Sequence, residues 1–303
     1  MRILVTGASG LLGLNLCLRL ADSHKITGIM NKNPLAGVPF DCVSLDLLNT
    51  NALKQSILRR NPELIVHCAA MANVDQCESQ PEQAWQINAD LPGEIASVCR
   101  ETGTKFIHIS TDAVFDGKMG DYTEEDAPKP LSVYATTKLD GEKIVQKENS
   151  DALIARVNFY GCSLSGNRSL AEFFLGNLSK KNQVNGFVDV MFCPLYVNDL
   201  VDTLMAMVEK GLNGLYHVVS PECLSKYAFG LKIAEKFGFD KDLIKPVSVK
   251  DGNLTARRSP RLSLNIEKLA AEKIIPPGQN DGLEHFHQDY LSGLAGKIQS
   301  FAA

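Results

Sequence analysis

The sequence lacks the features that would direct it to a membrane or to nucleic acid. None of its apolar runs approaches the ~18 residues of a membrane-spanning helix, and the N-terminus reads as a strand rather than a signal peptide. It has no run of Lys or Arg, and its 31 basic and 35 acidic residues give a net charge of −4. We therefore expect a cytoplasmic protein that binds neither nucleic acid nor anionic membranes.

The cysteines and histidines also lack the spacings of metal and disulfide sites. The eight cysteines include no CxxC pair, and Cys17, Cys68 and Cys193 lie in apolar runs, where we expect small core residues rather than a disulfide framework. No pattern supports a catalytic thiol. His285 and His287 stand two residues apart, which suits neither a helix-face nor a finger-type zinc site, so no metal is expected.

What the sequence does contain begins with a Gly-rich turn between an apolar strand, Ile3–Val5, and an apolar helix from about Leu11 to Leu20. Gly7 allows the tight turn, Gly10 lets backbone N–H groups approach a pyrophosphate, and Gly13 lets the helix pack on the strand. The helix N-terminus adds a partial positive charge. An ordinary Gly-rich turn is the alternative. The pattern predicts dinucleotide contacts from Gly7, Ser9, Gly10, Leu11, Leu12 and Gly13.

Strand-like and helix-like segments alternate through the first half of the chain. Further strands are predicted at 26–30, 42–45, 64–68, 105–110 and 153–157, with helices between several of them. This alternation is typical of an α/β fold, a Rossmann-type doubly wound parallel sheet with helices on both faces.

At 303 residues the chain is too long for one minimal domain. Residues 1–160 are predicted to form the dinucleotide-binding Rossmann domain, and residues 161–303 a smaller, interlocked substrate lobe, with 191–220 folding back onto the first domain. In this second part the sequence predicts helices at 170–178 and 226–237, a turn and helix within 195–208, and a strand at 215–219.

Tyr134 and Lys138 form the most informative pair. Four helical residues rise about 6 Å, so both side chains should project from one helix face. A lysine ammonium beside a phenol favours the phenolate, which lowers the tyrosine pKa toward the operating pH. Such a tyrosine can pass a proton to or from a substrate oxygen.

The end of the second predicted strand bears on the choice of cofactor. NAD-selective sites place Asp or Glu there to bind the ribose hydroxyls. This chain has Met30-Asn31-Lys32-Asn33, with no carboxylate and one cation. The segment predicts that NADP(H) is preferred over NAD(H), with Lys32 facing the 2′-phosphate. A solvated loop lysine is the alternative.

The order of motifs resembles the extended short-chain dehydrogenase/reductase superfamily: TGxxGxxG, a strand ending at Ala69-Ala70, Ser110-Thr111-Asp112, then YxxxK. Residues 109–117 are similar to the STDYVFDG motif of the dTDP-4-dehydrorhamnose reductase branch, the 4-keto reductases of nucleotide-sugars. Residues 138–142, 214–217 and 256–269 hold further matches. Ala113 stands where the family usually has tyrosine, Ala135 follows the catalytic tyrosine where the family has glycine, and Ser259, Arg261 and Leu262 interrupt the C-terminal motif.

The resemblance implies roles for individual residues. Thr111 would donate a hydrogen bond to the keto oxygen and Tyr134 would supply the proton. Lys138 would tune Tyr134 and bond the nicotinamide ribose. Ser110 is the alternative for the hydroxyl role, and Thr111 could instead satisfy a neighbouring backbone group. The remaining implied cofactor contacts are Asn31, Lys32, Asp46, Leu47, Ala69, Ala70, Met71, Ser110, Tyr134 and Lys138. The implied substrate contacts are Val74, Asp112, Phe115, Asn158 and Arg258.

Arg258 is the strongest of these substrate contacts, because a guanidinium can clamp a diphosphate with two parallel hydrogen bonds. A surface arginine in a cluster with Arg257 and Arg261 is the alternative.

The function implied is NADPH-dependent reduction of the 4-keto group of a nucleotide-linked deoxysugar. A dehydratase is disfavoured. Sugar-nucleotide dehydratases resemble a Thr-Asp-Glu motif at this point, and its glutamate is needed to eliminate water. This chain has Ala113 in place of that glutamate. Two alternatives remain. One is an epimerase that retains NAD, and the other is a non-catalytic dinucleotide-binding subunit that resembles the regulatory subunit of methionine adenosyltransferase. Dimers are common in the superfamily, so a homodimer is a further expectation.

Overall fold

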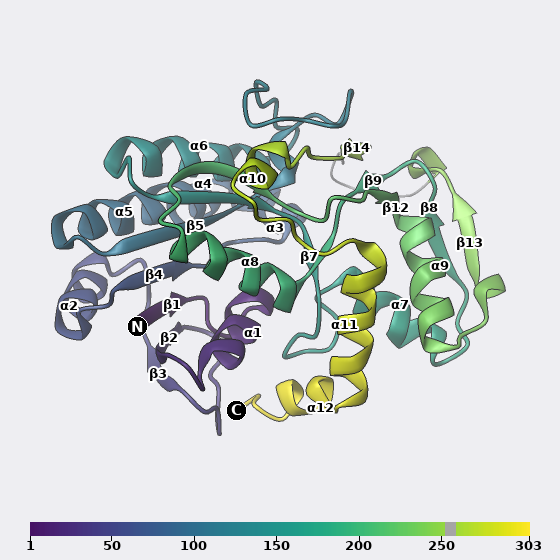
Figure 1. The fold of residues 1–303 in the computed structure, drawn as a ribbon, viewed down its shortest axis with the longest axis horizontal. Helices are drawn as coiled ribbons and strands as arrows, with labels where there is room; N and C mark the ends of the chain where they lie inside the picture. The colour runs from purple at the N-terminus through teal and green to yellow at the C-terminus, as the bar shows by residue number, and fades with distance from the viewer. Residues whose placement is uncertain (252–258) are drawn as a thin grey trace.

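The computed structural model describes residues 1–251 and 259–303 and contains a seven-stranded, all-parallel central sheet (Figure 1). The strand order is β11-β6-β5-β4-β1-β2-β3. The strands are β1 (Arg2–Thr6), β2 (Lys25–Met30), β3 (Asp41–Ser44), β4 (Leu64–His67), β5 (Lys105–Thr111), β6 (Leu153–Val157) and β11 (Gly214–Val218). The predicted α/β class with a doubly wound parallel sheet is confirmed.

Helices cover both faces of this sheet. On one face α1 (Leu11–Leu20) packs against α8 (Val197–Glu209), and on the other α2 (Thr50–Arg60), α5 (Leu91–Thr102) and α6 (Val133–Glu148) lie side by side (Figure 1). Each layer has its own apolar core, because the strands are buried on both sides. No helix in the described ranges is long and apolar enough to cross a bilayer.

The connection between β4 and α5 is helical but irregular. It consists of α3 (Val74–Ser79), α4 (Pro81–Trp85) and a π-helical turn at Gln86–Asp90. The turn buries Asn88, whose side chain accepts from the Met71 N–H at 2.9 Å and donates to the hydroxyl of Thr137 at 3.1 Å. This amide therefore ties the segment after β4 to α6, the helix that carries Tyr134.

The second half of the chain forms a smaller lobe beside the carboxyl ends of the strands. It contains α7 (Leu170–Leu178) and α9 (Lys226–Phe237), the parallel pair β8 (Val184–Phe187) and β13 (Ile244–Val247), and the pair β7 (Phe159–Tyr160) and β10 (Leu195–Tyr196). A three-stranded sheet has the order β12 (Leu224–Ser225), β9 (Met191–Phe192) and β14 (Arg261–Leu262). Between these elements the chain returns to the central sheet, where β11 pairs with β6.

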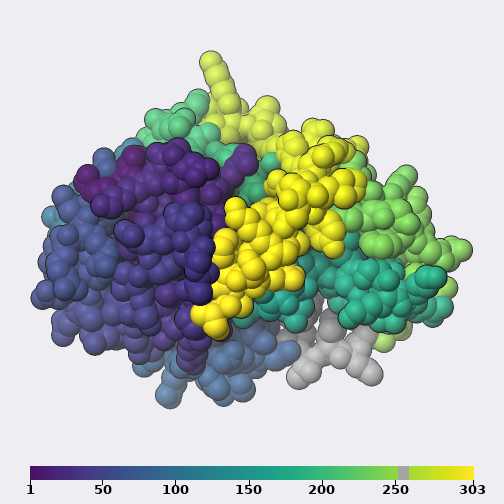
Figure 2. All heavy atoms as spheres, turned by 90° about the horizontal axis from the view of Figure 1, so that it is seen from below, coloured from purple at the N-terminus to yellow at the C-terminus, as the bar shows by residue number. Residues whose placement is uncertain are grey.

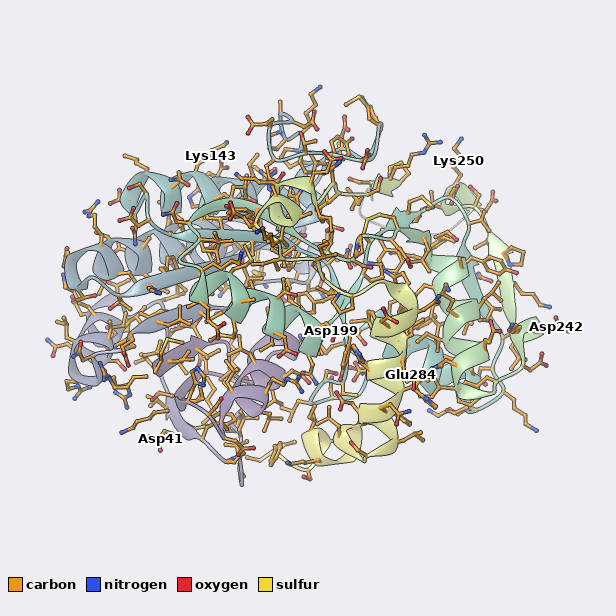
Figure 3. All side chains as sticks on the ribbon, viewed as in Figure 1. Asp41, Lys143, Asp199, Asp242, Lys250 and Glu284 are labelled. Carbon is orange, nitrogen blue, oxygen red and sulfur yellow. A yellow bond between two sulfur atoms is a disulfide. The ribbon has the colours of Figure 1, made fainter. Side chains whose placement is uncertain are left out.

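The C-terminal helices join the two halves. After α10 (Glu267–Ala271), the helices α11 (Gln279–Leu291) and α12 (Leu294–Gln299) run between the first strands and the second lobe (Figure 2). His285 Nδ1 of α11 lies 2.8 Å from Asp199 Oδ1 of α8 (Asp199 is labelled in Figure 3). The chain then ends against the β2–β3 connection, where the Ala36 N–H donates to the Phe301 carbonyl at 2.9 Å. This interlocking holds the second lobe in place over the sheet.

Short-range signals explain several of the element boundaries. α9 begins at Ser225, whose hydroxyl accepts from the Ala228 N–H, and ends at Gly238 with φ 71°. α7 begins with a capping box between Ser169 and Glu172. A polar cap is common at the start of a helix because its side chain accepts from the free backbone N–H groups. A left-handed glycine is common at the end because its conformation lets backbone N–H groups bond the free carbonyls.

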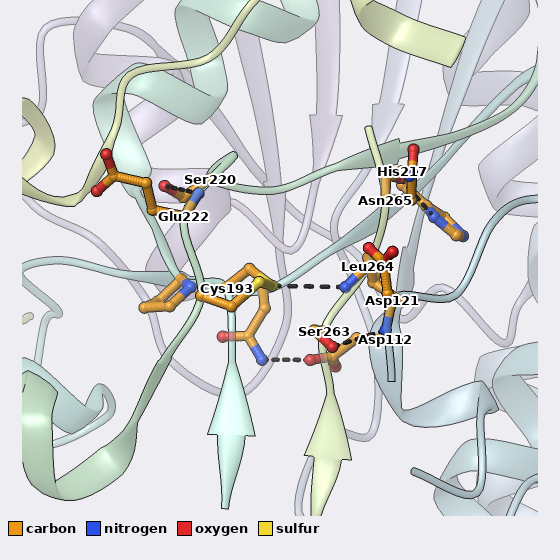
Figure 4. Close-up of a disulfide and its surroundings, with 12 residues drawn as sticks. Asp112, Asp121, Cys193, His217, Ser220, Glu222, Ser263, Leu264 and Asn265 are labelled. Carbon is orange, nitrogen blue, oxygen red and sulfur yellow. Dashed lines mark hydrogen bonds between the residues drawn. A yellow bond between two sulfur atoms is a disulfide. The ribbon is translucent and has the colours of Figure 1, made fainter. Parts of the chain in front are cut away.

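Cys193 is buried in the core, as predicted, but the expectation that the cysteines form no disulfide is wrong. Cys193 and Cys223 form a disulfide, with Cα atoms 4.1 Å apart (Figure 4). The two residues continue the antiparallel pairing of β9 with β12, in which Phe192 faces Leu224. The Leu264 N–H also donates to Cys193 Sγ at 3.4 Å. The 30-residue separation gives no local signal of this pairing.

Candidate active site

Close backbone packing explains the glycines of the first turn. Gly7 has φ +69°, and a Cβ placed on it would lie 2.7 Å from the backbone nitrogen of Ala69. A Cβ on Gly13 would lie 2.3 Å from the Gly7 carbonyl oxygen. Both positions therefore require glycine: Gly7 for its conformation and Gly13 for the approach of α1 to the turn.

A cleft of about 450 Å³ lies at the carboxyl ends of β1, β2 and β4, next to this turn. Carboxyl ends of parallel strands are where α/β folds bind dinucleotides. The predicted cofactor contacts that line the cleft are Gly7, Ser9, Gly10, Asn31, Lys32, Asp46, Leu47, Ala69, Ala70 and Met71. Leu11 lines an adjoining hollow, while Leu12 is buried in the core and Gly13 packs behind the turn.

Sequence reasoning missed other residues of the cleft. Gln76, Gln83 and Ile87 come from the irregular helices that follow β4, Leu91 from the start of α5, and Arg168 from the second lobe. No motif marks these positions, and Arg168 is distant in sequence from every other part of the cleft. The structure alone brings them to it.

Tyr134 and Thr111 lie together, as the motifs predict. A hydrogen bond joins the phenol to the Thr111 hydroxyl at the end of β5. Tyr134 is in the first turn of α6, which begins at Ser132, whose hydroxyl accepts from the Ala135 N–H at 3.2 Å. The cap fixes the start of the helix and so holds the phenol beside the end of the strand.

The Lys138 ammonium is directed elsewhere than predicted. Its Nζ donates to the Ile109 carbonyl at 2.6 Å and lies 3.3 Å from His108 Nε2. Burial lowers the pKa of Lys138 to about 8. Burial raises the pKa of Tyr134 to about 12, and the hydrogen bond with Thr111 opposes this only in part. The prediction that Lys138 draws the pKa of Tyr134 toward neutrality is wrong in this structure, and Tyr134 is held in its protonated form.

Two buried histidines surround Lys138. His67 of β4 and His108 of β5 stack with ring centroids 5.7 Å apart, and His67 Nδ1 lies 2.8 Å from the Thr6 hydroxyl. Burial, and then the Lys138 charge, lower the pKa of both, that of His67 to about 3. Both rings are therefore neutral at pH 7, and Lys138 carries the positive charge of this cluster.

Ser110 lies on the same face of β5 as His108, the face that α6 covers. Its hydroxyl donates to the Glu142 carboxylate, which also accepts from Arg156 Nε at 3.0 Å and Nη2 at 2.8 Å. The side chains of Glu142 and Arg156 are 6% and 3% exposed. The alternative that gave Ser110 the catalytic hydroxyl is wrong, because this buried ion pair occupies its hydroxyl.

A second pocket, of about 140 Å³, lies beside Tyr134. Of the predicted substrate contacts, Val74 and Asn158 line it. Residues of the second lobe complete the wall, among them Met191, Phe192 and Lys226, which the sequence did not single out. The pocket therefore lies between the start of α6 and the small sheet of the second lobe.

Two of the predicted substrate contacts are internal. Phe115 is 0% exposed and stacks on Tyr122 at 4.2 Å between ring centroids, so it is a core residue and the prediction is wrong. Asp112 is 4% exposed, and its carboxylate accepts from Asn158 Nδ2 at 2.6 Å and from the Thr111 hydroxyl at 3.1 Å (Figure 4 shows Asp112). Asp112 thus fixes the orientation of the Asn158 and Thr111 side chains through hydrogen bonds. Arg258 lies outside the described residues.

Comparison with known proteins identifies the family. The RmlD substrate binding domain family matches residues 1–292. The chain belongs to this family. The predicted resemblance to the dTDP-4-dehydrorhamnose reductase branch of the extended short-chain dehydrogenase/reductase superfamily is confirmed.

Individual relatives carry two kinds of name. The "Probable low-salt glycan biosynthesis reductase Agl14" of Haloferax volcanii is 34% identical over 275 residues, which cover 88% of this chain and 91% of that protein. Methionine adenosyltransferase 2 subunit beta of Mus musculus is 33% identical over 279 residues, which cover 88% and 81%. The crystal structure of dTDP-4-dehydrorhamnose reductase from Bacillus anthracis in complex with NADP has a TM-score of 0.85 and 26% identity, and the match covers 95% of this chain and 99% of that one.

Proposed function

We propose that this protein reduces the 4-keto group of a nucleotide-linked deoxysugar with NADPH. The observation that carries the proposal is the position of Tyr134. It is protonated, it is hydrogen-bonded to Thr111, and it lines a pocket whose wall includes Val74, three residues beyond Met71 of the dinucleotide-type cleft. The two relatives named as reductases support the same chemistry.

The cleft fits a dinucleotide. Gly7 and Gly13 leave the turn too tight for any Cβ, which is how a backbone comes close enough to bind a pyrophosphate. Ala69 and Ala70 have short side chains that allow a nicotinamide riboside to lie against the end of β4. Lys32 and the absence of Asp or Glu at 31–33 favour a cofactor that carries a 2′-phosphate. The cofactor supplies the hydride.

The side chains of this protein then handle the proton. The Tyr134 phenol donates its proton to the oxygen that was the ketone, and its high pKa keeps that proton in place until negative charge develops on the substrate. Thr111 holds the substrate oxygen and Tyr134 in one geometry, and Asp112 fixes Thr111. Lys138, one helical turn away and fixed by the Ile109 carbonyl, is assigned to the nicotinamide ribose rather than to the phenol.

The nucleotide part of the substrate is assigned to the second lobe, consistent with a division of the chain near residue 160. Lys226 lines the pocket and brings a cation toward it. A cytoplasmic location and a homodimer belong to the same proposal.

The assay is NADPH oxidation followed at 340 nm against dTDP-, GDP-, UDP- and CDP-linked 4-keto-6-deoxysugars. We expect turnover with at least one of them, and NADPH more efficient than NADH. Absence of turnover with the whole panel, in protein shown to bind NADPH, would contradict a reductase of this class.

The second candidate is a regulatory subunit without turnover, favoured by the 33% identity to methionine adenosyltransferase 2 subunit beta. The intact Thr111, Tyr134 and Lys138 favour an enzyme but are compatible with both. A methionine adenosyltransferase that copurifies with the protein, together with silence in the sugar assay, would establish this candidate instead.

The pH dependence of kcat/KM should be bell-shaped. Burial raises the pKa of Asp112 to about 6, so below that pH it gains a proton and loses acceptor capacity for Thr111 and Asn158. Burial lowers the pKa of Lys138 to about 8, so above that pH the ammonium loses its charge. We expect a plateau between these values. In Asp112→Asn the acidic limb should disappear while the alkaline limb stays, and an unchanged acidic limb would exclude Asp112 as its source.

A further inference from the structure

An arginine of the second lobe lies on the wall of the cofactor cleft. Arg168 comes just before α7 and lines both the cleft and the hollow that adjoins it. Ser9 of the Gly-rich turn and Asn33, three residues after the end of β2, also line both. Arg168 therefore shares its surroundings with the end of β2, the part of such a site that receives the adenosine ribose.

A buried carboxylate fixes the backbone around Arg168. Glu172, 8% exposed, accepts from the N–H of Arg168 at 2.8 Å and from the hydroxyl of Ser163 at 2.8 Å. Ser169 closes the capping box of α7 by accepting the Glu172 N–H at 3.2 Å. The turn is thus rigid, while the Arg168 side chain itself is exposed. A rigid turn that carries an exposed guanidinium presents it at low entropic cost.

Two cations face this end of the cleft without a protein counterion. Among the described residues, neither Lys32 nor Arg168 has a side-chain hydrogen bond or ion pair with another protein group. Among the described residues that line the cleft, Asp46 is the one carboxylate, and its Oδ1 accepts from the Leu48 N–H at 3.1 Å. Lys32 lines the cleft and Arg168 lines both the cleft and the hollow, so an anion bound at this end of the cleft would offer a counterion to both.

We propose that Arg168 and Lys32 together bind the 2′-phosphate of NADPH, with the Ser9 hydroxyl as a further donor. The inference rests on the proposed function only in taking NADPH as the cofactor. Arg168 offers two parallel N–H groups to the phosphate oxygens and Lys32 a compact charge. Because Arg168 belongs to the second lobe, the phosphate bridges the two halves of the molecule, and NADH leaves that bridge unmade.

Calorimetric titration of the protein with NADPH and NADH, without any sugar, tests the inference. Arg168→Gln should raise the Kd for NADPH about 10- to 100-fold, the range for one charge-assisted pair, and leave the Kd for NADH within about twofold. Lys180→Ala is the matched control. It removes a cation from an exposed position just beyond α7 and should change neither Kd.

The other outcomes would overturn the proposal in distinct ways. An equal loss of NADPH and NADH affinity in Arg168→Gln would place the arginine on the diphosphate, and no loss would make it a solvated surface residue.

Two further variants have expected results. Arg168→Lys should recover part of the NADPH affinity, and Lys32→Gln combined with Arg168→Gln should abolish the discrimination between the two cofactors. Since no sugar is present, ketosugar reduction with either cofactor succeeds or fails independently of these results.

Discussion

Replacing Tyr134 by phenylalanine is expected to lower kcat about 100- to 10,000-fold, the usual contribution of a positioned general acid. The phenol contacts Thr111 and lines the substrate pocket, and burial raises its pKa to about 12, so at pH 7 it is protonated and positioned to donate. KM and the affinity for NADPH should change little, because the ring itself remains. Stopped-flow measurement of NADPH oxidation separates the chemical step from binding.

Tyr290→Phe is the matched control for this variant. Tyr290 lies on α11, is 40% exposed and lines neither the cleft nor the pocket, so loss of its hydroxyl should leave kcat unchanged. A Tyr134→Phe protein that keeps wild-type kcat would show that the proton comes from another donor. The proposed mechanism would then be wrong even if the reaction were the one proposed.

The second large effect is expected on stability, from Glu142→Ala. Glu142 holds the buried Arg156 through two hydrogen bonds, at 3.0 and 2.8 Å, and also accepts from Ser110. Removing it leaves a guanidinium uncompensated between the sheet and α6, which costs about 3–5 kcal/mol. The melting temperature should fall by roughly 5–15 °C. Thermal and urea unfolding, followed by circular dichroism, measure both quantities.

Two further variants test the cause of that loss. Glu148→Ala removes a carboxylate from the end of the same helix, where its pair with Arg100 spans 3.8 Å at the surface, and should cost about 1 kcal/mol or less. Glu142→Leu combined with Arg156→Met removes both charges and should recover much of the stability, because an apolar pair of similar size replaces the ions. If the double variant is no more stable than Glu142→Ala, the uncompensated arginine is not the cause.

Local sequence signals sufficed for the elements that build the central sheet and its nearest helices. α1, α7 and α9 begin and end at the predicted residues; a glycine or serine cap precedes each of them, and Gly238 marks the end of α9. The strands were visible as short apolar runs that alternate with helices. The two-residue strands of the second lobe could not be predicted, since tertiary pairing alone defines them.

The site was predictable where the backbone carries the function and less so where side chains do. Gly7 and Gly10 were placed in the cleft by their spacing, Lys32 by its position after the second predicted strand, and Ala69 and Ala70 by the family resemblance. Spacing could not show that Lys138 donates to the Ile109 carbonyl, or that Phe115 points into the core, because both depend on neighbours from other elements. The position of Arg168 in the cleft and the Cys193–Cys223 disulfide were not predicted for the same reason.

The most direct test of the central claim is the sugar assay repeated with NADPH that carries deuterium at C4 of the nicotinamide, in each diastereotopic position in turn. Mass spectrometry and NMR of the sugar product locate the label. We predict one deuterium per product molecule, at C4 of the sugar, from only one of the two cofactor isomers. Reduced sugar without deuterium, or cofactor binding without any reduced sugar, would contradict hydride transfer by this protein.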